Sequence, residues 1–197
     1  MRTPADMLNA TVDPDADSPT LMAQVAAGNA VAFTALVERL HGTALRVATK
    51  VLGSRSDADD AVQAALTKLW TQAHRYEPGR GSVEGWFRRI LINLCLDRRR
   101  SVRVVQPLET AAEIASPGPT PFEAASSTAR ARRIDAAMAR LNPRQRAAIL
   151  LFHGEGASMT EVATALDATP KAVEGLLARA RIELSQLLAS DQAEICD

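Results

Sequence analysis

The sequence is poor in aromatic residues and cysteines, and few stretches show the alternating apolar pattern of a half-buried β-strand. Aromatic residues make up 4% of the 197 residues, whereas the good helix formers alanine, leucine and arginine are abundant. We therefore expect an all-α fold. The two cysteines, Cys95 and Cys196, form neither a disulfide framework nor a metal-binding spacing. Cys95 lies in an apolar helical run, where we expect a small core residue.

A long apolar run is also missing. The first nineteen residues are polar and acidic, which excludes a secretory signal peptide, and no stretch is long enough to cross a bilayer. We expect a cytoplasmic protein. His41, His74 and His153 are scattered without metal-ligand spacing, and no glycine-rich phosphate loop is present. We therefore expect no metal, no cofactor and no catalytic residues, so an enzyme is disfavoured.

Charge is balanced overall but separated along the chain. There are 23 basic and 23 acidic residues, and a zero net charge by itself neither supports nor excludes a nucleic-acid partner. Residues 1–20 are acidic, whereas residues 75–103 hold eight arginines and three carboxylates. The second segment is therefore the one in which we look for a binding surface.

Proline and glycine divide the chain into segments. Residues 1–19 are expected to be a disordered extension. A first helical unit follows at 20–100, and a proline-rich linker at 101–128 separates it from a second unit at 129–190. A short helical turn near 108–114 is the only structure expected in the linker.

Capping residues locate the helices of the first unit. Thr20 is the expected N-cap of the first helix, and the pair at Gly28 ends it. The next helix is expected to stop at Gly53. Ser56 and Ser82 are the expected N-caps of the two helices that follow.

The second unit contains a helix-turn-helix pattern. Asn142 followed by proline indicates a helix start, because proline lacks only a hydrogen that would be unpaired there. Ser158 and Glu161 form a capping box. Two helices, at 158–165 and 169–188, flank a tight turn. Apolar residues at positions suited to packing them together are Val162, Ala163, Leu166, Val173 and Leu177. A helical hairpin that only packs is the alternative interpretation.

The stretch at residues 81–100, GSVEGWFRRILINLCLDRRR, suggests a surface for unpaired bases. Such bases are held by aromatic rings beside a basic track, and Tyr76, Trp86 and Phe87 lie near several arginines in sequence. The competing interpretation is that Trp86 and Phe87 belong to the core, and that the arginines at 98–100 are a solvated helix end.

Several motifs together resemble the extracytoplasmic-function (ECF) sigma factors of the sigma-70 family. They occur in the family's order, with a proline-rich gap between the two halves. The motifs are SDADDAVQ at 56–63 with LW at 69–70, GSVEGWFRRILIN at 81–93 with DR at 97–98, LNPRQR at 141–146, EVA at 161–163 and LARAR at 177–181.

The resemblance implies a sigma-two domain that binds core RNA polymerase and the melted minus-ten element, and a sigma-four domain that reads the minus-thirty-five element. It implies the beta and beta-prime subunits, promoter DNA and an anti-sigma factor as partners. The implied polymerase-binding residues are Asp57, Asp60, Gln63, Leu69 and Trp70. The implied minus-ten residues are Arg75, Tyr76, Arg80, Ser82, Trp86, Arg88, Arg89, Asn93, Arg98 and Arg99, with Asn93 contacting a base. The implied minus-thirty-five residues are Thr169, Lys171, Ala172, Glu174, Gly175, Arg179 and Arg181.

The chain departs from the family pattern at several positions. Asp167 replaces a common glycine in the hairpin turn, where aspartate tolerates a left-handed backbone better than most residues. Glu174 and Leu176 replace a common lysine and arginine, so duplex affinity of the second unit alone is expected to be low. Glu174 would accept from a cytosine amino group or serve an anti-sigma interface, and both alternatives stay open.

The main competing function is a stand-alone helix-turn-helix regulator. Such a protein has no reason to carry the block at residues 56–100, which distinguishes the two hypotheses.

Overall fold

The computed structural model describes residues 13, 15–105 and 129–193, and every regular element in these residues is helical, as the sequence predicts. The first unit contains α2 (Ser18–Ala26), α3 (Ala30–Leu52), α4 (Arg55–Gln72), the 3-10 turn η1 (Ala73–Arg75) and α5 (Val83–Val105). The second unit contains α7 (Ala129–Arg140), α8 (Pro143–Ile149), the π-helical turn η2 (Leu150–Gly154), α9 (Met159–Ala165) and α10 (Pro170–Ala193).

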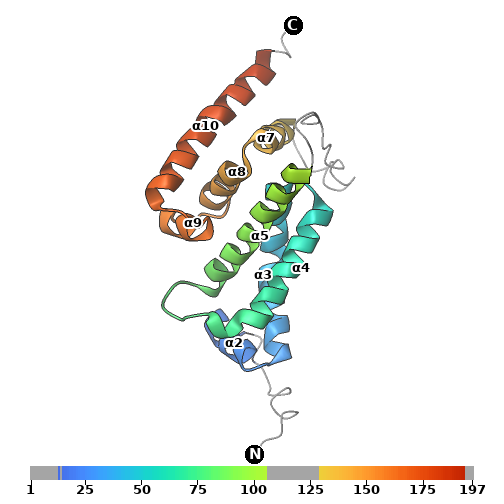
Figure 1. Cartoon of the computed structure of the whole chain (residues 1–197), viewed down its shortest axis with the longest axis vertical. Helices are drawn as coiled ribbons and strands as arrows, with labels where there is room; N and C mark the ends of the chain where they lie inside the picture. The colour runs from blue at the N-terminus through green and yellow to red at the C-terminus, as the bar shows by residue number, and fades with distance from the viewer. Residues whose placement is uncertain (1–12, 14, 106–128, 194–197) are drawn as a thin grey trace, which may run out of the picture.

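Helix α5 lies at the centre of the molecule. On one side it packs with α3 and α4, and on the other it contacts α8 and α9 (Figure 1). The buried residues form one continuous apolar cluster from Leu21 in α2 to Leu177 in α10. Cys95 is fully buried in this cluster, as expected, and burial raises the pKa of its thiol to about 12. The two helical units therefore share one core rather than lying apart.

Local capping explains most helix ends. Asn29 caps α3, whose C-cap Gly53 has a left-handed backbone with φ 75°. The capping boxes of α8 and α9, at Asn142 and Ser158, are both present. Two expected caps are wrong by a few residues: Asp17 rather than Thr20 caps α2, and Ser54 rather than Ser56 caps α4. Several short polar side chains precede each of these helices, and the sequence alone does not select among them.

The expected linker and N-terminal extension lie largely outside the described residues. Within the described part, α5 continues through Val105, so the first five residues assigned to the linker are helical. Helix α2 begins at Ser18, two residues before the expected start of the first unit. The helical turn expected near 108–114 lies outside the described residues.

Candidate nucleic-acid interface

A capped loop joins η1 to α5. Ser82 accepts a hydrogen bond from the Gly85 backbone N–H at 3.0 Å, and a Cβ at Gly85 would lie only 3.2 Å from the Ser82 oxygen. The Tyr76 hydroxyl donates to the Gly81 carbonyl at 3.0 Å. Tyr76 also meets Trp86 edge-on, with ring centroids 6.1 Å apart. These contacts close the loop onto the first turn of α5, so both rings are held at one place.

A cavity of about 630 Å³ opens beside these rings. Four arginines line it together with Tyr76 and Trp86, and they are Arg75, Arg80, Arg88 and Arg89. Burial, followed by the charges of Glu84 and Asp17, raises the pKa of Tyr76. The cavity therefore combines aromatic faces with guanidinium donors, the combination that suits an unstacked base and its phosphates. We call it the arginine–aromatic cavity.

The opposite wall of the arginine–aromatic cavity comes from the second unit. Ser158, Thr160, Glu161 and Thr164 line it, at the start of α9 and along it. Hydrogen bonds from Ser158 lower the pKa of Glu161. The arginines and rings were predicted from the sequence but this wall was not, because α9 lies more than fifty residues further along the chain.

Other predicted minus-ten residues lie further along α5. Asn93 is half-buried on this helix, while Phe87 is buried with an exposed fraction of 3%. The core interpretation therefore holds for Phe87, whereas Trp86 is half-buried and reaches the cavity.

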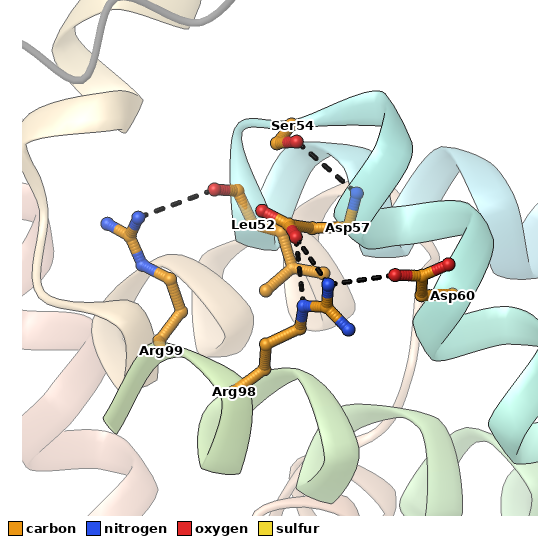
Figure 2. A network of polar contacts seen from close by, with 6 residues as sticks. All are labelled: Leu52, Ser54, Asp57, Asp60, Arg98 and Arg99. Atoms are coloured by element: carbon orange, nitrogen blue, oxygen red, sulfur yellow. Dashed lines mark hydrogen bonds and ion pairs between the residues drawn. The ribbon is translucent and has the colours of Figure 1, made fainter. Parts of the chain in front are cut away.

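Arg98 lies at the opposite end of α5 and joins the two predicted binding sets. Its guanidinium contacts Asp57 Oδ1 at 2.7 Å and Asp60 Oδ2 at 2.8 Å, across the space between α5 and α4 (Figure 2). The hydrogen bond to Asp57 is the largest contribution to a raised pKa of Arg98. Arg99 instead donates to the Leu52 carbonyl at 3.4 Å. A predicted DNA-binding arginine and two predicted polymerase-binding carboxylates thus bind one another.

The remaining predicted polymerase-binding residues differ in their exposure. Gln63 is exposed on α4, and Leu69 is fully buried in the core. Trp70 is 37% exposed and packs edge-on against Phe33, with ring centroids 5.1 Å apart. Trp70 therefore offers a large apolar surface that the chain itself leaves partly uncovered.

Helices α9 and α10 form the expected helix-turn-helix. All five residues expected to pack the pair are buried. Asp167 in the turn has a left-handed backbone with φ 50°, as the sequence predicts for an aspartate in place of glycine. Thr169 accepts from the Ala172 backbone N–H at 3.2 Å, so its hydroxyl caps α10.

The first part of α10 presents a mixed polar face. The exposed predicted residues are Thr169, Lys171, Ala172, Glu174, Arg179 and Arg181, and Gly175 is half-buried. The Arg179 guanidinium lies back over Gly175, 3.8 Å from where a Cβ would stand. Arg181 lies 3.4 Å from the His153 ring nitrogen. This face has the donor and acceptor groups that read base edges in a major groove.

Arg146 is the residue whose role the sequence did not indicate. Its side chain is 2% exposed, and its guanidinium donates to the carbonyls of Val51, Ala139 and Leu141. Burial, with the nearby charge of Arg99, lowers its pKa to about 10. It belongs to the LNPRQR motif, but nothing in that motif indicates that its partner lies in α3.

Two family models match the chain. The model of sigma-70 region 2 covers residues 36–104, and the model of sigma-70 region 4 covers residues 131–184. The chain belongs to the sigma-70 family. The resemblance inferred from the motifs is thereby confirmed, and the matched segments of this sigma factor hold α3 to α5 and α7 to α10.

Relatives identify the sigma factor as one of the ECF type. It is 34% identical over 190 residues to RNA polymerase sigma factor CnrH of Cupriavidus metallidurans, covering 91% of this chain and 98% of the relative. It is 33% identical to ECF RNA polymerase sigma factor SigM of Mycobacterium tuberculosis, covering 85% of this chain and 83% of the relative.

Solved structures share the fold of the sigma factor. CnrH in complex with the cytosolic domain of CnrY matches with a TM-score of 0.64 and 32% identity, over 89% of this chain and 99% of that one. The sigma factor RpoE of Bartonella quintana, in complex with the anti-sigma factor NepR, matches with a TM-score of 0.60 at 22% identity, over 81% of this chain and 98% of that one. Among the described residues, no helix of the sigma factor combines the length and apolarity needed to cross a bilayer.

Proposed function

We propose that this sigma factor binds core RNA polymerase, directs it to specific promoters and stabilises strand separation there. The observation that carries the proposal is the arginine–aromatic cavity, where Tyr76 and Trp86 are held beside four arginines. Stacking an unpaired base on an aromatic ring contributes about 1–3 kcal/mol, which offsets part of the cost of unpairing it. The protein then acts by binding energy and needs no bond chemistry of its own.

Two further surfaces divide the remaining work. In the first unit, residues 20–100, the half-exposed Trp70 and the carboxylates Asp57 and Asp60 suit a basic partner helix on the polymerase. In the second unit, residues 129–190, the start of α10 suits the major groove of the minus-thirty-five element. Asn93 is placed to contact a base beyond the cavity. Because the polymerase works in the cytoplasm, the sigma factor is expected there too.

An anti-sigma factor is a further proposed partner. Two solved relatives were captured in complexes, CnrH with the cytosolic domain of CnrY and RpoE with the anti-sigma factor NepR. A protein that binds either the polymerase surface or the DNA surfaces would hold this sigma factor inactive. Glu174 on α10 is exposed, and it would serve such a protein interface or a cytosine in the promoter.

The test is reconstituted transcription. The purified chain is added to sigma-free core polymerase with genomic DNA, and the 5′ ends of new transcripts are mapped against a reaction with core polymerase alone. A small set of starts that share upstream sequence at two positions is the expected result. A chain that binds duplex DNA but neither binds core polymerase nor creates new starts would instead be a stand-alone helix-turn-helix regulator.

A further inference from the structure

The second unit lies directly against the face of α5 that carries the arginine–aromatic cavity. Helix α9 packs on α5, and α8 contacts both α3 and α5 (Figure 1). Residues of α9 form one wall of the cavity. The surface proposed to hold unpaired DNA therefore faces the chain's own helix-turn-helix unit, not open solvent alone.

An ion pair joins the hairpin turn to the cavity. Arg89 of α5 lies 3.1 Å from the Asp167 carboxylate, in the turn between α9 and α10. Asp167 presents an oxygen anion to Arg89, as a DNA phosphate would. One of the cavity's four arginines is thus occupied by a carboxylate from the second unit.

The same docking obstructs the recognition helix. Asp167 precedes the first residue of α10, Pro170, by three positions. A major groove is about 12 Å wide and closes around the helix that enters it. With α5 in contact with the turn, the start of α10 has a protein helix where one side of the duplex would lie.

A second ion pair and one buried arginine hold the arrangement. Arg46 of α3 lies 3.2 Å and 3.3 Å from the two carboxylate oxygens of Glu155, which follows η2. Arg146 of α8 donates to the Val51 carbonyl at 3.0 Å. That carbonyl belongs to the last turn of α3, where the backbone carries partial negative charge and lacks helical partners. Arg146 therefore anchors the second unit to the end of a helix in the first.

We propose that the helix-turn-helix unit is the intramolecular occupant of the arginine–aromatic cavity, so that the free sigma factor rests in a closed form that masks both of its DNA-binding surfaces. The proposal rests on the function proposed above for those surfaces. Opening needs no large cost, because the Arg89–Asp167 pair is well exposed, with side chains 47% and 77% accessible. Exposed pairs contribute little and are screened by salt, so binding to a large partner is enough to separate the units.

The test uses variants that break the contacts between the units and leave each unit's own packing intact. Arg146 is unsuitable, because it also binds the Ala139 and Leu141 carbonyls of its own unit. The double variant E155Q D167N removes both interdomain carboxylates, and asparagine tolerates the left-handed backbone of the turn. The matched control E38Q D135N removes two exposed carboxylates that form no ion pair within the described part of the chain.

Two measurements on the full chain decide the question. Small-angle X-ray scattering should give a larger radius of gyration for E155Q D167N than for the wild type, and fluorescence anisotropy with single-stranded oligonucleotides should show at least threefold tighter binding. The control should match the wild type in shape and bind clearly less tightly than E155Q D167N. An unchanged radius, or a wild type that is already extended, would refute the closed form. A larger radius without tighter binding than the control would refute the masking.

A charge exchange provides the rescue. E155R places two like charges together and should open the chain, whereas R46E E155R restores an ion pair of reversed polarity and should return the radius to the wild-type value. An exchange variant as extended as E155R would contradict the role of this pair. These measurements are made without polymerase, so a chain that fails to bind polymerase would sink the proposed function and leave the result on closure standing.

Discussion

The Arg98 guanidinium on α5 contacts the Asp57 carboxylate on α4 at 2.7 Å, and it reaches Asp60 on the same helix at 2.8 Å (Figure 2). Arg98 and Asp57 are each 39% exposed, and Asp60 is 56% exposed. Each carboxylate therefore retains surface for an outside partner while it is paired. A mutation of Asp60 has two effects, one on this network and one on any polymerase contact.

A charge exchange separates the two effects at Asp60. Asp60→Arg should weaken assembly with core polymerase and lower stability by up to about 1 kcal/mol, because it removes an exposed ion pair and adds a like charge beside Arg98. The double variant D60R R98E should recover the melting temperature without recovering polymerase binding. Co-purification with core polymerase and thermal denaturation measure the two outcomes. If the exchange restored polymerase binding to the wild-type level, Asp60 would act only through Arg98.

Loss of the base-holding groups should stop initiation and spare polymerase binding. The double variant N93A W86A removes an aromatic surface of the cavity and the half-buried amide on α5. Because each stacked base contributes about 1–3 kcal/mol, transcription from a cognate promoter should fall by about tenfold or more. Trp86→Phe retains a ring and serves as the matched control, with near-normal activity expected. Loss of core binding in N93A W86A would show that the two residues are structural.

Two glycines, one inside α3 and one at its end, should respond to alanine in opposite directions. Gly53 has φ 75° at the C-cap, a conformation that an alanine adopts only with strain, so Gly53→Ala should destabilise the protein by about 1 kcal/mol. Gly42 lies inside the helix, and no atom lies within 4 Å of the place that a Cβ would occupy there. Gly42→Ala should therefore stabilise the protein by about 0.5–1 kcal/mol. Urea denaturation of both variants measures the difference, and equal signs for the two changes would contradict the assignment of Gly53 as a cap.

The capping box at α9 should make stability depend on acidity. Hydrogen bonds from Ser158 lower the pKa of Glu161, so the folded state favours the ionised carboxylate. That contribution is present above the unfolded pKa of about 4.3 and is lost as the pH falls through the lower folded value. Glu161→Gln should therefore cost about 0.5 kcal/mol at pH 7.

The difference between wild type and E161Q should shrink as the pH is lowered from about 6 to about 3, the range that spans the unfolded pKa of a glutamate. Denaturation curves at several pH values measure it, with D135N as the control for loss of an exposed carboxylate. A difference that stayed constant over this range would mean that the ionised form of Glu161 is not what the cap binds.

Much of the fold follows from the sequence, because helix ends depend on contacts between residues three or four positions apart. The capping box of Ser158 and Glu161, the start at Asn142 and the stop at Gly53 were all readable in this way. The same local code carries the helix-turn-helix and the motifs that resemble the family. Where two short polar residues competed, as Ser54 and Ser56 did, the local code was ambiguous and the cap was placed wrongly.

The pairing of charges was decided only by the tertiary structure. Arg98 lies 41 residues from Asp57, Arg89 lies 78 residues from Asp167, and Arg146 lies 95 residues from Val51. Arginine side chains are long and chemically alike, so a sequence with many of them does not indicate which carboxylate or carbonyl each one meets. The packing of α5 between α4 and α9 sets those distances, and with them it determines which arginines face solvent and which are already bound.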